Sequence, residues 1–502
     1  MNALPLYRQL ADHYAQAIQL GTLAVGERMP SVRTLMARHQ VSLSTALQIC
    51  RHLEERGVLE ARPRSGYFVL ARRRLAPVQE PTPQLPDPAQ FVGINTRVSA
   101  ILARGQQAAV KVNLAGAVGA PELYPSKALR QSAMRALRTQ PDLFGRAVPM
   151  QGEPGFRQVL AQRALANGMQ LAADDIVVTQ GCTEALNLAL RAIAQPGDVI
   201  AVESPTFYGL LQILESLGLR ALEIPTSPQT GISLEALELA ADTYDNIRGI
   251  VVVPNLQNPL GCTMPHEHKA RLVAWCAARN IALIEDDTYA ALSNRDVPLS
   301  TLKGLDRGGN VIHCASSHKM LAPGMRLGWI SAGRWQQRVA MLKFAQSRPN
   351  EALPQLAVAD FMASPAFERH LRRLRATLRT QREQLAEAIA RHFPSGTRLT
   401  VPDGGLGLWI ALPDGSDGVA LFDAALAAGI RIAPGVMFSN SQRFNSHIRL
   451  SCGQPYTRGL DEAIRWLGAW LVQCQSQRDH EPPNCATRLM PSLHPSSSQP
   501  YD

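Results

Sequence analysis

Long hydrophobic runs are absent from the 502-residue sequence. No apolar stretch approaches the roughly 18–20 residues that a membrane-spanning helix needs, so we expect no membrane association. The N-terminal stretch also carries Arg8 and Asp12 where a secretory signal would need an apolar segment. We therefore expect the protein to act in the cytoplasm.

Cysteine is scarce, with eight residues scattered along the chain and no C-x-x-C pair. This usage is typical of reduced thiols in a cytosol and argues against a disulfide framework. The H-E-x-x-H spacing of a helical zinc site is missing too, because only Glu267 separates His266 from His268. The sequence therefore predicts no metal centre.

Charged residues are only 18% of the chain, whereas hydrophobic residues make up 46%, which is typical of a chain that folds around sizeable cores. At roughly 150 residues per domain, the length predicts three domains or two large ones. The net charge is +10, and residues 1–76 alone carry +6, from eleven arginines, no lysine and five acidic residues. Such a basic module indicates a nucleic-acid partner, and a solvated basic surface is the alternative.

The first 70 residues follow the pattern of three helices and a hairpin. Apolar residues recur every four positions from Leu6 to Ile18, which predicts an amphipathic helix. Ser31 can cap a second short helix, and Ser42 or Ser44 can cap a third. The predicted elements are three helices that end near Gly21, Arg38 and Arg56, followed by strands over 58–61 and 67–70.

A basic hairpin after three helices is the arrangement of a winged helix-turn-helix. The string GERMPSVRTLMARHQVSLSTALQICRHLEERGVLEARPRSGYFV resembles the GntR-type winged-helix module over its whole length. The resemblance implies that the third helix lies in the major groove of a double-stranded DNA operator. The candidates for DNA contact that it implies are Arg33, Ser42, Ser44, Thr45 and Arg64. Leu43 departs from the more polar residue often found there, which leaves the base preference open; a winged helix used for protein contacts is the alternative.

The composition changes after residue 70, where five prolines follow three consecutive arginines. This composition predicts that an extended spacer over 71–111 separates the winged helix of 1–70 from a large domain over 112–473. Within the large domain we expect a smaller lobe over roughly 350–473. The proline- and serine-rich stretch 474–502 predicts a disordered tail.

The large domain alternates short β-branched runs with amphipathic stretches, which predicts an α/β fold with a mainly parallel sheet. The predicted strands are 175–179, 198–202, 249–253, 281–285, 311–315 and 327–331. Sites of such sheets lie at the carboxyl ends of the strands. Polar clusters follow the first five strands: Gly181-Cys182-Thr183-Glu184, Thr206-Phe207-Tyr208, Asn255 to Asn258, Asp286 to Tyr289, and Ser316 to Lys319 with Arg326 beyond.

One ligand accounts for these five clusters, namely a pyridine ring that carries an aldehyde, a phenolate and a phosphate. The constellation, in this order, resembles the fold-type I pyridoxal-phosphate enzymes of the class I/II aminotransferase family over nearly all of 113–473. The resemblance implies a pyridoxal 5'-phosphate cofactor, with Lys319 as the catalytic Schiff-base lysine. It assigns the ring nitrogen to Asp286, the phenolate to Tyr289 and Asn258, the ring face to Phe207 before Tyr208, and the phosphate to Gly181, Cys182, Thr183, Ser316 and Arg326.

Farther along, His447-Ile448-Arg449-Leu450-Ser451 resembles the strand whose arginine binds an amino acid's α-carboxylate, so Arg449 is the implied substrate or effector anchor. The chain departs from the family pattern at His318, where serine is usual. Phe144 falls near the position where many family members have a tyrosine that reaches the cofactor phosphate in the partner subunit. A phenylalanine at this position cannot make that hydrogen bond.

A GntR-type winged helix joined by a spacer to an aminotransferase-like domain resembles the MocR subfamily of transcription regulators. The resemblance implies a homodimer that senses pyridoxal phosphate, or its adduct with an amino acid or amine, and changes its binding to DNA. An active aminotransferase with an accessory DNA-binding domain is the alternative, because every core catalytic position is present. A sensor of cofactor supply, with little use for Arg449, is a third interpretation.

Overall fold

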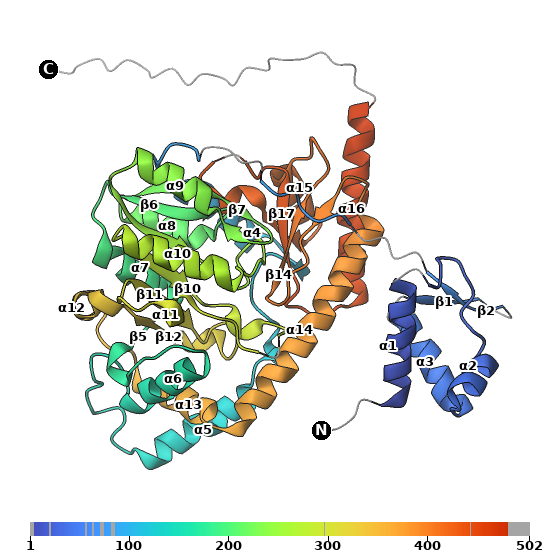
Figure 1. Ribbon diagram of the computed structural model, residues 1–502, viewed down its shortest axis with the longest axis horizontal. Helices are drawn as coiled ribbons and strands as arrows, with labels where there is room; N and C mark the ends of the chain where they lie inside the picture. The colour runs from blue at the N-terminus through green and yellow to red at the C-terminus, as the bar shows by residue number, and fades with distance from the viewer. Residues whose placement is uncertain are drawn as a thin grey trace. The chain divides into compact units, whose positions relative to one another are not determined.

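The computed structural model describes residues 5–19, 22–55, 58–62, 65–70, 75–81, 86–295, 297–441 and 443–479. The chain divides into two compact units, one built mainly on the chain up to Ala76 and the other mainly on the chain from Pro77 onward. Figure 1 labels their elements, and each unit is described by itself.

The N-terminal unit folds as predicted into three helices and an antiparallel hairpin. Its elements are α1 (Leu6–Gln19), α2 (Val32–His39), α3 (Leu43–Glu55), β1 (Leu59–Arg62) and β2 (Gly66–Val69). Ser31 caps α2 by accepting a hydrogen bond from the backbone N–H of Thr34 at 3.1 Å. Ser42 caps α3 through the N–H of Thr45 at 3.2 Å, so Ser42 rather than Ser44 is the cap. The buried core includes Ala11, Leu35, Ile49, Leu53 and Val69.

A nine-stranded sheet forms the centre of the large unit, in the order β3-β7-β6-β9-β10-β11-β12-β5, with β8 beside β7. The strands are β3 (Gln90–Phe91), β5 (Val177–Thr179), β6 (Val199–Ser204), β7 (Arg220–Ser227), β8 (Gly231–Ile232), β9 (Ile247–Val252), β10 (Ala282–Asp286), β11 (Val311–Ser316) and β12 (Gly328–Ser331). The stretch from β7 to β11 is parallel, whereas β3 and β12 are antiparallel to their neighbours. The predicted α/β fold with a mainly parallel sheet is thus confirmed.

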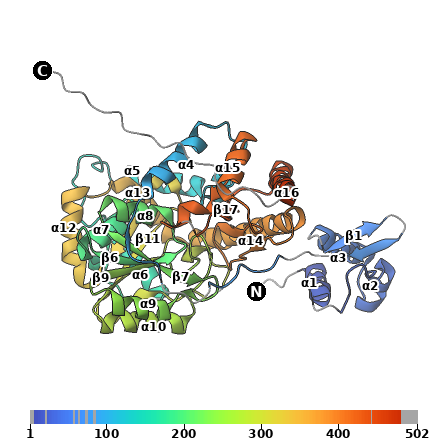
Figure 2. The ribbon, with the colours of Figure 1, turned by 90° about the horizontal axis from the view of Figure 1, so that it is seen from above.

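Helices cover both faces of this sheet (Figure 2). One face packs against α9, α10 and α11 through apolar residues that include Leu237, Leu272 and Leu302, while α7 lies on the other face. The helices are α4 (Asn95–Gln107), α5 (Ser126–Thr139), α6 (Pro154–Ala166), α7 (Cys182–Ile193), α8 (Tyr208–Ser216), α9 (Leu234–Thr243), α10 (His266–Ala278), α11 (Leu302–Leu305), α12 (Gln336–Gln346), α13 (Ala352–Met362), α14 (Pro365–His392), α15 (Gly418–Ala427) and α16 (Arg458–Asp479).

A second, antiparallel sheet lies in the region predicted as the smaller lobe, in the order β13-β14-β17-β16. Its strands are β13 (Arg398–Leu399), β14 (Gly407–Ala411), β16 (Ala433–Pro434) and β17 (His447–Ser451). A short strand that precedes β16, β15 (Ile430–Arg431), pairs in parallel with β4 (Val112–Asn113) in a separate two-stranded sheet. β4 thereby connects the start of the large domain to the segment just before β16.

The prediction of an extended spacer over 71–111 is wrong for its second half. Strand β3 pairs with β7, and the backbone N–H groups of Ile94 and Asn95 both donate to Glu215 at 2.7 Å. Helix α4 follows and buries Val98 and Ile101. The prolines that indicated a spacer end at Pro88, and a helical apolar pattern begins within ten residues of that position.

The predicted tail over 474–502 also starts too early, because α16 continues to Asp479; residues 480–502 lie outside the described part of the chain. The apolar set of α16 thins out after Leu471, so the sequence pattern ends before the helix does. Among the described residues, no helix is both long enough and apolar enough to cross a membrane.

Candidate ligand site and nucleic-acid interface

The polar clusters predicted from the sequence converge at the carboxyl edge of the central sheet. Asp286 is the last residue of β10, Ser316 is the last residue of β11, and Lys319 lies three residues farther on. Arg326 comes before its strand rather than after it. Because β12 is antiparallel to β11, the start of β12 lies at the same edge as the end of β11, which brings Arg326 to the cluster.

Lys319 is held in the interior by its own hydrogen bond. Its Nζ donates to the backbone carbonyl of Ala117 at 2.7 Å and lies 5.7 Å from the centroid of the Tyr289 ring. Burial, reinforced by the positive charge of Arg449, lowers the pKa of Lys319 to about 8, and Asp286 opposes this shift. About a tenth of the amine is therefore neutral and nucleophilic at pH 7, a far larger fraction than for an ordinary lysine.

Asp286 is a buried carboxylate with defined neighbours. Its Oδ1 accepts hydrogen bonds from the hydroxyl and the N–H of Thr288, at 2.6 and 3.1 Å, and from the thiol of Cys182 at 3.3 Å. Burial raises the pKa of Asp286 above its usual range, while the hydrogen bonds from Thr288 and Cys182 act in the opposite direction. A cation or a protonated ring nitrogen beside Asp286 would stabilise the ionised form.

The start of α7 forms an anion-binding corner. Gly181 precedes the helix with a φ of +82°, a conformation that glycine adopts without strain. The Arg326 guanidinium lies 3.6 Å from where a β-carbon of Gly181 would be, and it donates to the carbonyl of Gln180 at 3.3 Å. Cys182 and Thr183 open the helix, and its free N–H groups add to the positive charge of Arg326.

Arg449 lies on β17 and is only 4% exposed. Its guanidinium donates to Asn258 Oδ1 at 2.8 Å and to the carbonyl of Ala115 at 2.6 Å. Its Nε is buried without a hydrogen-bond partner among the described residues. A cavity lies beside it, lined by residues that include Ala117, Asn258, Tyr289, Gly407 and Arg449. Two of the predicted phenolate partners and the predicted carboxylate anchor thus share one cavity.

The aromatic loop after β6 places its two rings differently. Tyr208 lines a second cavity together with Arg449, whereas the Phe207 ring stands 5.0 Å from the Tyr208 ring. The structure therefore places Tyr208, the second choice from the sequence, in the lining of the cavity that Arg449 also lines. The spacing of two adjacent aromatics on a loop could not decide between them.

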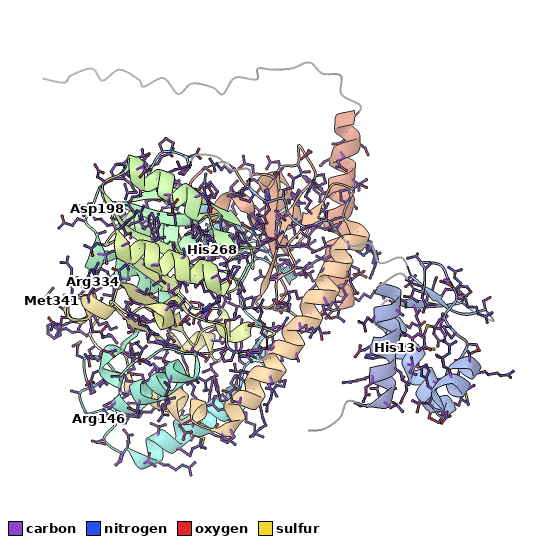
Figure 3. The ribbon with its side chains drawn as sticks, viewed as in Figure 1. His13, Arg146, Asp198, His268, Arg334 and Met341 are labelled. Atoms are coloured by element: carbon purple, nitrogen blue, oxygen red, sulfur yellow. The ribbon has the colours of Figure 1, made fainter. Side chains whose placement is uncertain are left out.

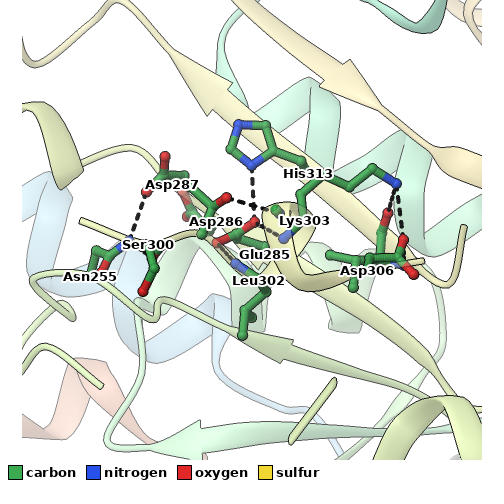
Figure 4. A network of polar contacts seen from close by, with 12 residues as sticks. Asn255, Glu285, Asp286, Asp287, Ser300, Leu302, Lys303, Asp306 and His313 are labelled. Carbon is green, nitrogen blue, oxygen red and sulfur yellow. Dashed lines mark hydrogen bonds and ion pairs between the residues drawn. The ribbon is translucent and has the colours of Figure 1, made fainter. Parts of the chain in front are cut away.

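A buried charge network behind Asp286 was missed by the sequence analysis (Figure 4). His313 Nδ1 lies 3.1 Å from Glu285, and the backbone N–H of Leu302 donates to Glu285 at 2.7 Å. On the other side of Asp286, Asp287 accepts from Asn255 at 3.4 Å. This network fixes the end of β10, and the run Glu285-Asp286-Asp287 after an apolar strand was its only sequence signal.

The His266-Glu267-His268 run forms the first turn of α10, where His266 is exposed and His268 is half-buried. His268, labelled on α10 in Figure 3, contacts the carbonyl of Ile232 through Nε2 at 2.8 Å. In the part of the chain that the structure describes, no group of three or more His, Cys, Asp or Glu side chains is arranged to hold a metal ion.

The candidate DNA contacts lie on the surface of the N-terminal unit. Arg33 on α2 is exposed, as are Ser42 and Ser44 at the start of α3, and Thr45 is half-buried. The Ser42 hydroxyl contacts the hydroxyls of Ser44 at 2.8 Å and Thr45 at 2.9 Å. Leu43 is 54% exposed between them. The remaining candidate, Arg64, lies outside the described residues.

Two family models match the chain, aminotransferase class I and II over residues 111–467 and the gntR family of bacterial regulatory proteins over residues 6–69. The chain is 35% identical to the uncharacterized HTH-type transcriptional regulator YjiR of Escherichia coli, over 92% of this chain and 98% of that protein. It is 36% identical to the uncharacterized HTH-type transcriptional regulator YdcR of the same organism, over 93% of this chain and 99% of that protein.

Solved structures match the large unit. The α-aminoadipate aminotransferase LysN of Thermus thermophilus, complexed with N-(5'-phosphopyridoxyl)-L-leucine, is 26% identical with a TM-score of 0.69, over 75% of this chain and 95% of that chain. The kynurenine aminotransferase of Pyrococcus horikoshii, in complex with PMP, is 25% identical with a TM-score of 0.70, over 75% of this chain and 94% of that chain.

The large unit thus has the fold of the class I and II aminotransferases, and a winged helix precedes it in the same chain. The chain belongs to the gntR family of bacterial regulatory proteins, in the MocR subfamily that joins these two domains.

Proposed function

We propose that the large unit binds pyridoxal phosphate at the carboxyl edge of its sheet, and that an amino compound bound there alters DNA binding by the winged helix. The observation that carries this proposal is that the partly buried amine of Lys319 and the buried carboxylate of Asp286 lie within electrostatic reach of each other, at the sheet edge where α7 begins. The chemistry of these donors fits the cofactor: an amine for an aldehyde, a carboxylate for a ring nitrogen and N–H groups for a phosphate.

Each predicted residue then has a defined task. When bound, the cofactor supplies an aldehyde that condenses with amines and a ring that accepts electrons. The residues that would hold it are Lys319 at the aldehyde, Asp286 at the ring nitrogen, Asn258 and Tyr289 at the phenolate, Phe207 at the ring face, and Gly181, Cys182, Thr183, Ser316 and Arg326 at the phosphate. Asp286 would keep a proton on the ring nitrogen, and Arg449 would bind the carboxylate of the amino compound.

The winged helix would read a double-stranded operator. The exposed Ser42 and Ser44 and the half-buried Thr45 at the start of α3 would reach base edges and phosphates, while Arg33 and Arg64 would contact the backbone. The protein would act where bacterial DNA lies, in the cytoplasm. Two copies would bind two half-sites as a homodimer.

An active aminotransferase is the second candidate, because Lys319, Asp286 and Arg449 have the placement that catalysis needs. Mixing the cofactor-loaded protein with amino acids separates the two functions. A regulator changes the absorbance of its bound cofactor once, without sustained formation of keto acid, and shifts the mobility of the DNA upstream of its own gene. Continuous keto acid formation, without any sequence-specific DNA shift, would contradict the regulatory function.

A further inference from the structure

The cavity next to Arg449 on the side of α4 has a chemistry of its own. Its walls are mostly apolar and include Ile101, Phe422 and Met437, and its polar lining includes Tyr208, Arg431 and Arg449. None of its lining residues, all within the described part of the chain, is acidic. Two arginines therefore face a cavity whose other walls are mostly apolar, and their charge is not balanced within it.

Arg431 is the arginine of this pair that has no role in the proposed function. It belongs to β15, where its backbone pairs with Asn113 of β4, and its side chain is half-buried. Within the described residues the structure records no ion pair or hydrogen bond for its guanidinium. Arg449 has an open position as well, because its buried Nε has no partner there. A buried donor without a partner is costly, and a ligand that accepts from the Arg449 Nε and supplies a counter-charge to the half-buried Arg431 removes this cost.

Helix α4 fixes the position of the Arg431 side chain. Gly105 on α4 is buried, and a β-carbon at this position would lie 2.5 Å from Arg431 Nε and 2.9 Å from Cζ. The absence of a side chain at Gly105 thus makes room for the guanidinium against the helix. Because α4 also supplies Ile101 and Leu102 to the cavity, the helix that replaces half of the predicted spacer forms one wall of this site.

We propose that Arg431 binds the distal acidic group of the effector, so that the effector is an amino dicarboxylate whose α-carboxylate binds Arg449. This inference rests on the proposed function and names its ligand class. The apolar walls suit the methylene groups between the two carboxylates, and Arg431 and Arg449 each offer a forked donor to one carboxylate. A monocarboxylic amino acid leaves Arg431 without its counter-charge.

The test uses the full-length protein loaded with pyridoxal phosphate and follows the absorbance of the bound cofactor. The probes are L-glutamate with L-glutamine and L-aspartate with L-asparagine, which differ within each pair in the distal charge and cover two chain lengths. At least one acid is expected to bind about 10- to 100-fold more tightly than its amide, the range for a hydrogen-bonded charge pair. Equal affinities within both pairs would overturn the proposal.

Variants separate a binding role for Arg431 from a packing role. Arg431→Gln is expected to remove the preference for the acid and to leave the affinity for the amide within about twofold. Gly105→Ala should weaken the preference without lowering the melting temperature, because alanine favours helices more than glycine does. Arg248→Gln, at a surface position 54% exposed, is the matched control and should change neither. A preference that persists in Arg431→Gln would also overturn the proposal.

A cofactor-free measurement keeps this test independent of the proposed function. Glutarate has two carboxylates and no amine, and valerate has one carboxylate, so neither reacts with an aldehyde. Calorimetry on the cofactor-free protein should show that glutarate binds more tightly than valerate. The Arg431→Gln variant should bind the two acids with equal affinity. If no amino acid perturbs the bound cofactor but glutarate still binds through Arg431, the amino-compound function fails and the arginine site stands. Equal binding of both acids refutes the arginine site.

Discussion

All described arginines of the N-terminal unit are exposed, at positions 8, 28, 33, 38, 51 and 62. The large unit, in contrast, buries several basic side chains in its interior. Lys269, Lys343 and Arg449 are each 4% exposed or less. Exposed cations keep their hydration and suit an extended anionic partner such as DNA. Buried cations lose hydration, which lowers the pKa of Lys269 to about 8, and they need a specific counter-charge. The two units therefore fit two kinds of anion, a polymer and a small ligand.

The largest effect is expected from Lys319→Ala. This change removes the amine that would bind the cofactor's aldehyde, so the characteristic absorbance and the mass gained after borohydride reduction should both disappear. DNA affinity of the cofactor-free protein should stay within about twofold, because the winged helix has its own core. The control is Lys127→Ala, at an exposed position on α5. Retained covalent attachment in Lys319→Ala would refute the assignment of the lysine.

The next largest effect is expected from the salt concentration, which should change the affinity for DNA much more than the affinity for the small ligand. Raising the salt concentration from 50 to 200 mM is expected to weaken DNA binding about 1,000-fold, if six or more phosphates are contacted. Binding of the small effector should change by less than about threefold, because buried charges are poorly screened. Fluorescence anisotropy measures the first affinity and cofactor absorbance the second. Equal salt dependence of both would remove the distinction between exposed and buried charge.

The pH dependence of cofactor uptake tests the burial of Lys319. The neutral amine is the reactive form, and burial lowers the pKa of Lys319 to about 8. The rate of uptake by the cofactor-free protein should therefore rise about tenfold between pH 7 and pH 9 and level off above this range. Stopped-flow absorbance gives the rate at each pH. A rate that keeps rising beyond pH 10 would indicate an amine with an unperturbed pKa.

The smallest expected effect concerns the cap of α3. Ser42→Ala removes the acceptor for the N–H of Thr45 and should destabilise the start of α3 by about 1 kcal/mol. Hydrogen exchange at the Thr45 amide in the full chain reports this change. Ser44→Ala is the matched control, because its hydroxyl contacts Ser42 but is not the cap. Similar exchange in both variants would argue against the cap.

Most of the structural features that could be predicted from the sequence depend on local patterns of residues. The cap at Ser31, the hairpin and the strands that end at Asp286 and Ser316 depend on neighbouring residues, and the order of the polar clusters placed Lys319 at the sheet edge. The features that could not be predicted depend on pairing between segments far apart in the sequence. Arg431 lies on a two-residue strand whose partner, β4, is more than 300 residues away, and no local pattern marks such a pair.

Burial of charge was equally hidden in the sequence. Arg372 and Arg373 of α14 are exposed, yet Arg382 on the same helix is 2% exposed and donates to the carbonyl of Gly405 at 3.3 Å. Lys269 lies in an amphipathic helix and donates to Asn255 at 2.6 Å, with only 1% exposed. In both cases the partner comes from a distant loop, which the spacing of charges within one helix cannot reveal.

The most direct test of the account is the affinity of the cofactor-loaded, full-length protein for the DNA upstream of its own gene, with and without a saturating amino compound. Cofactor absorbance in the same sample establishes that the compound is bound. Coupling between the two sites predicts a change in DNA affinity of about fivefold or more, because an effector acts through its different affinity for two states. Unchanged DNA affinity with the compound bound would contradict the claim that the small-ligand site controls the DNA-binding unit.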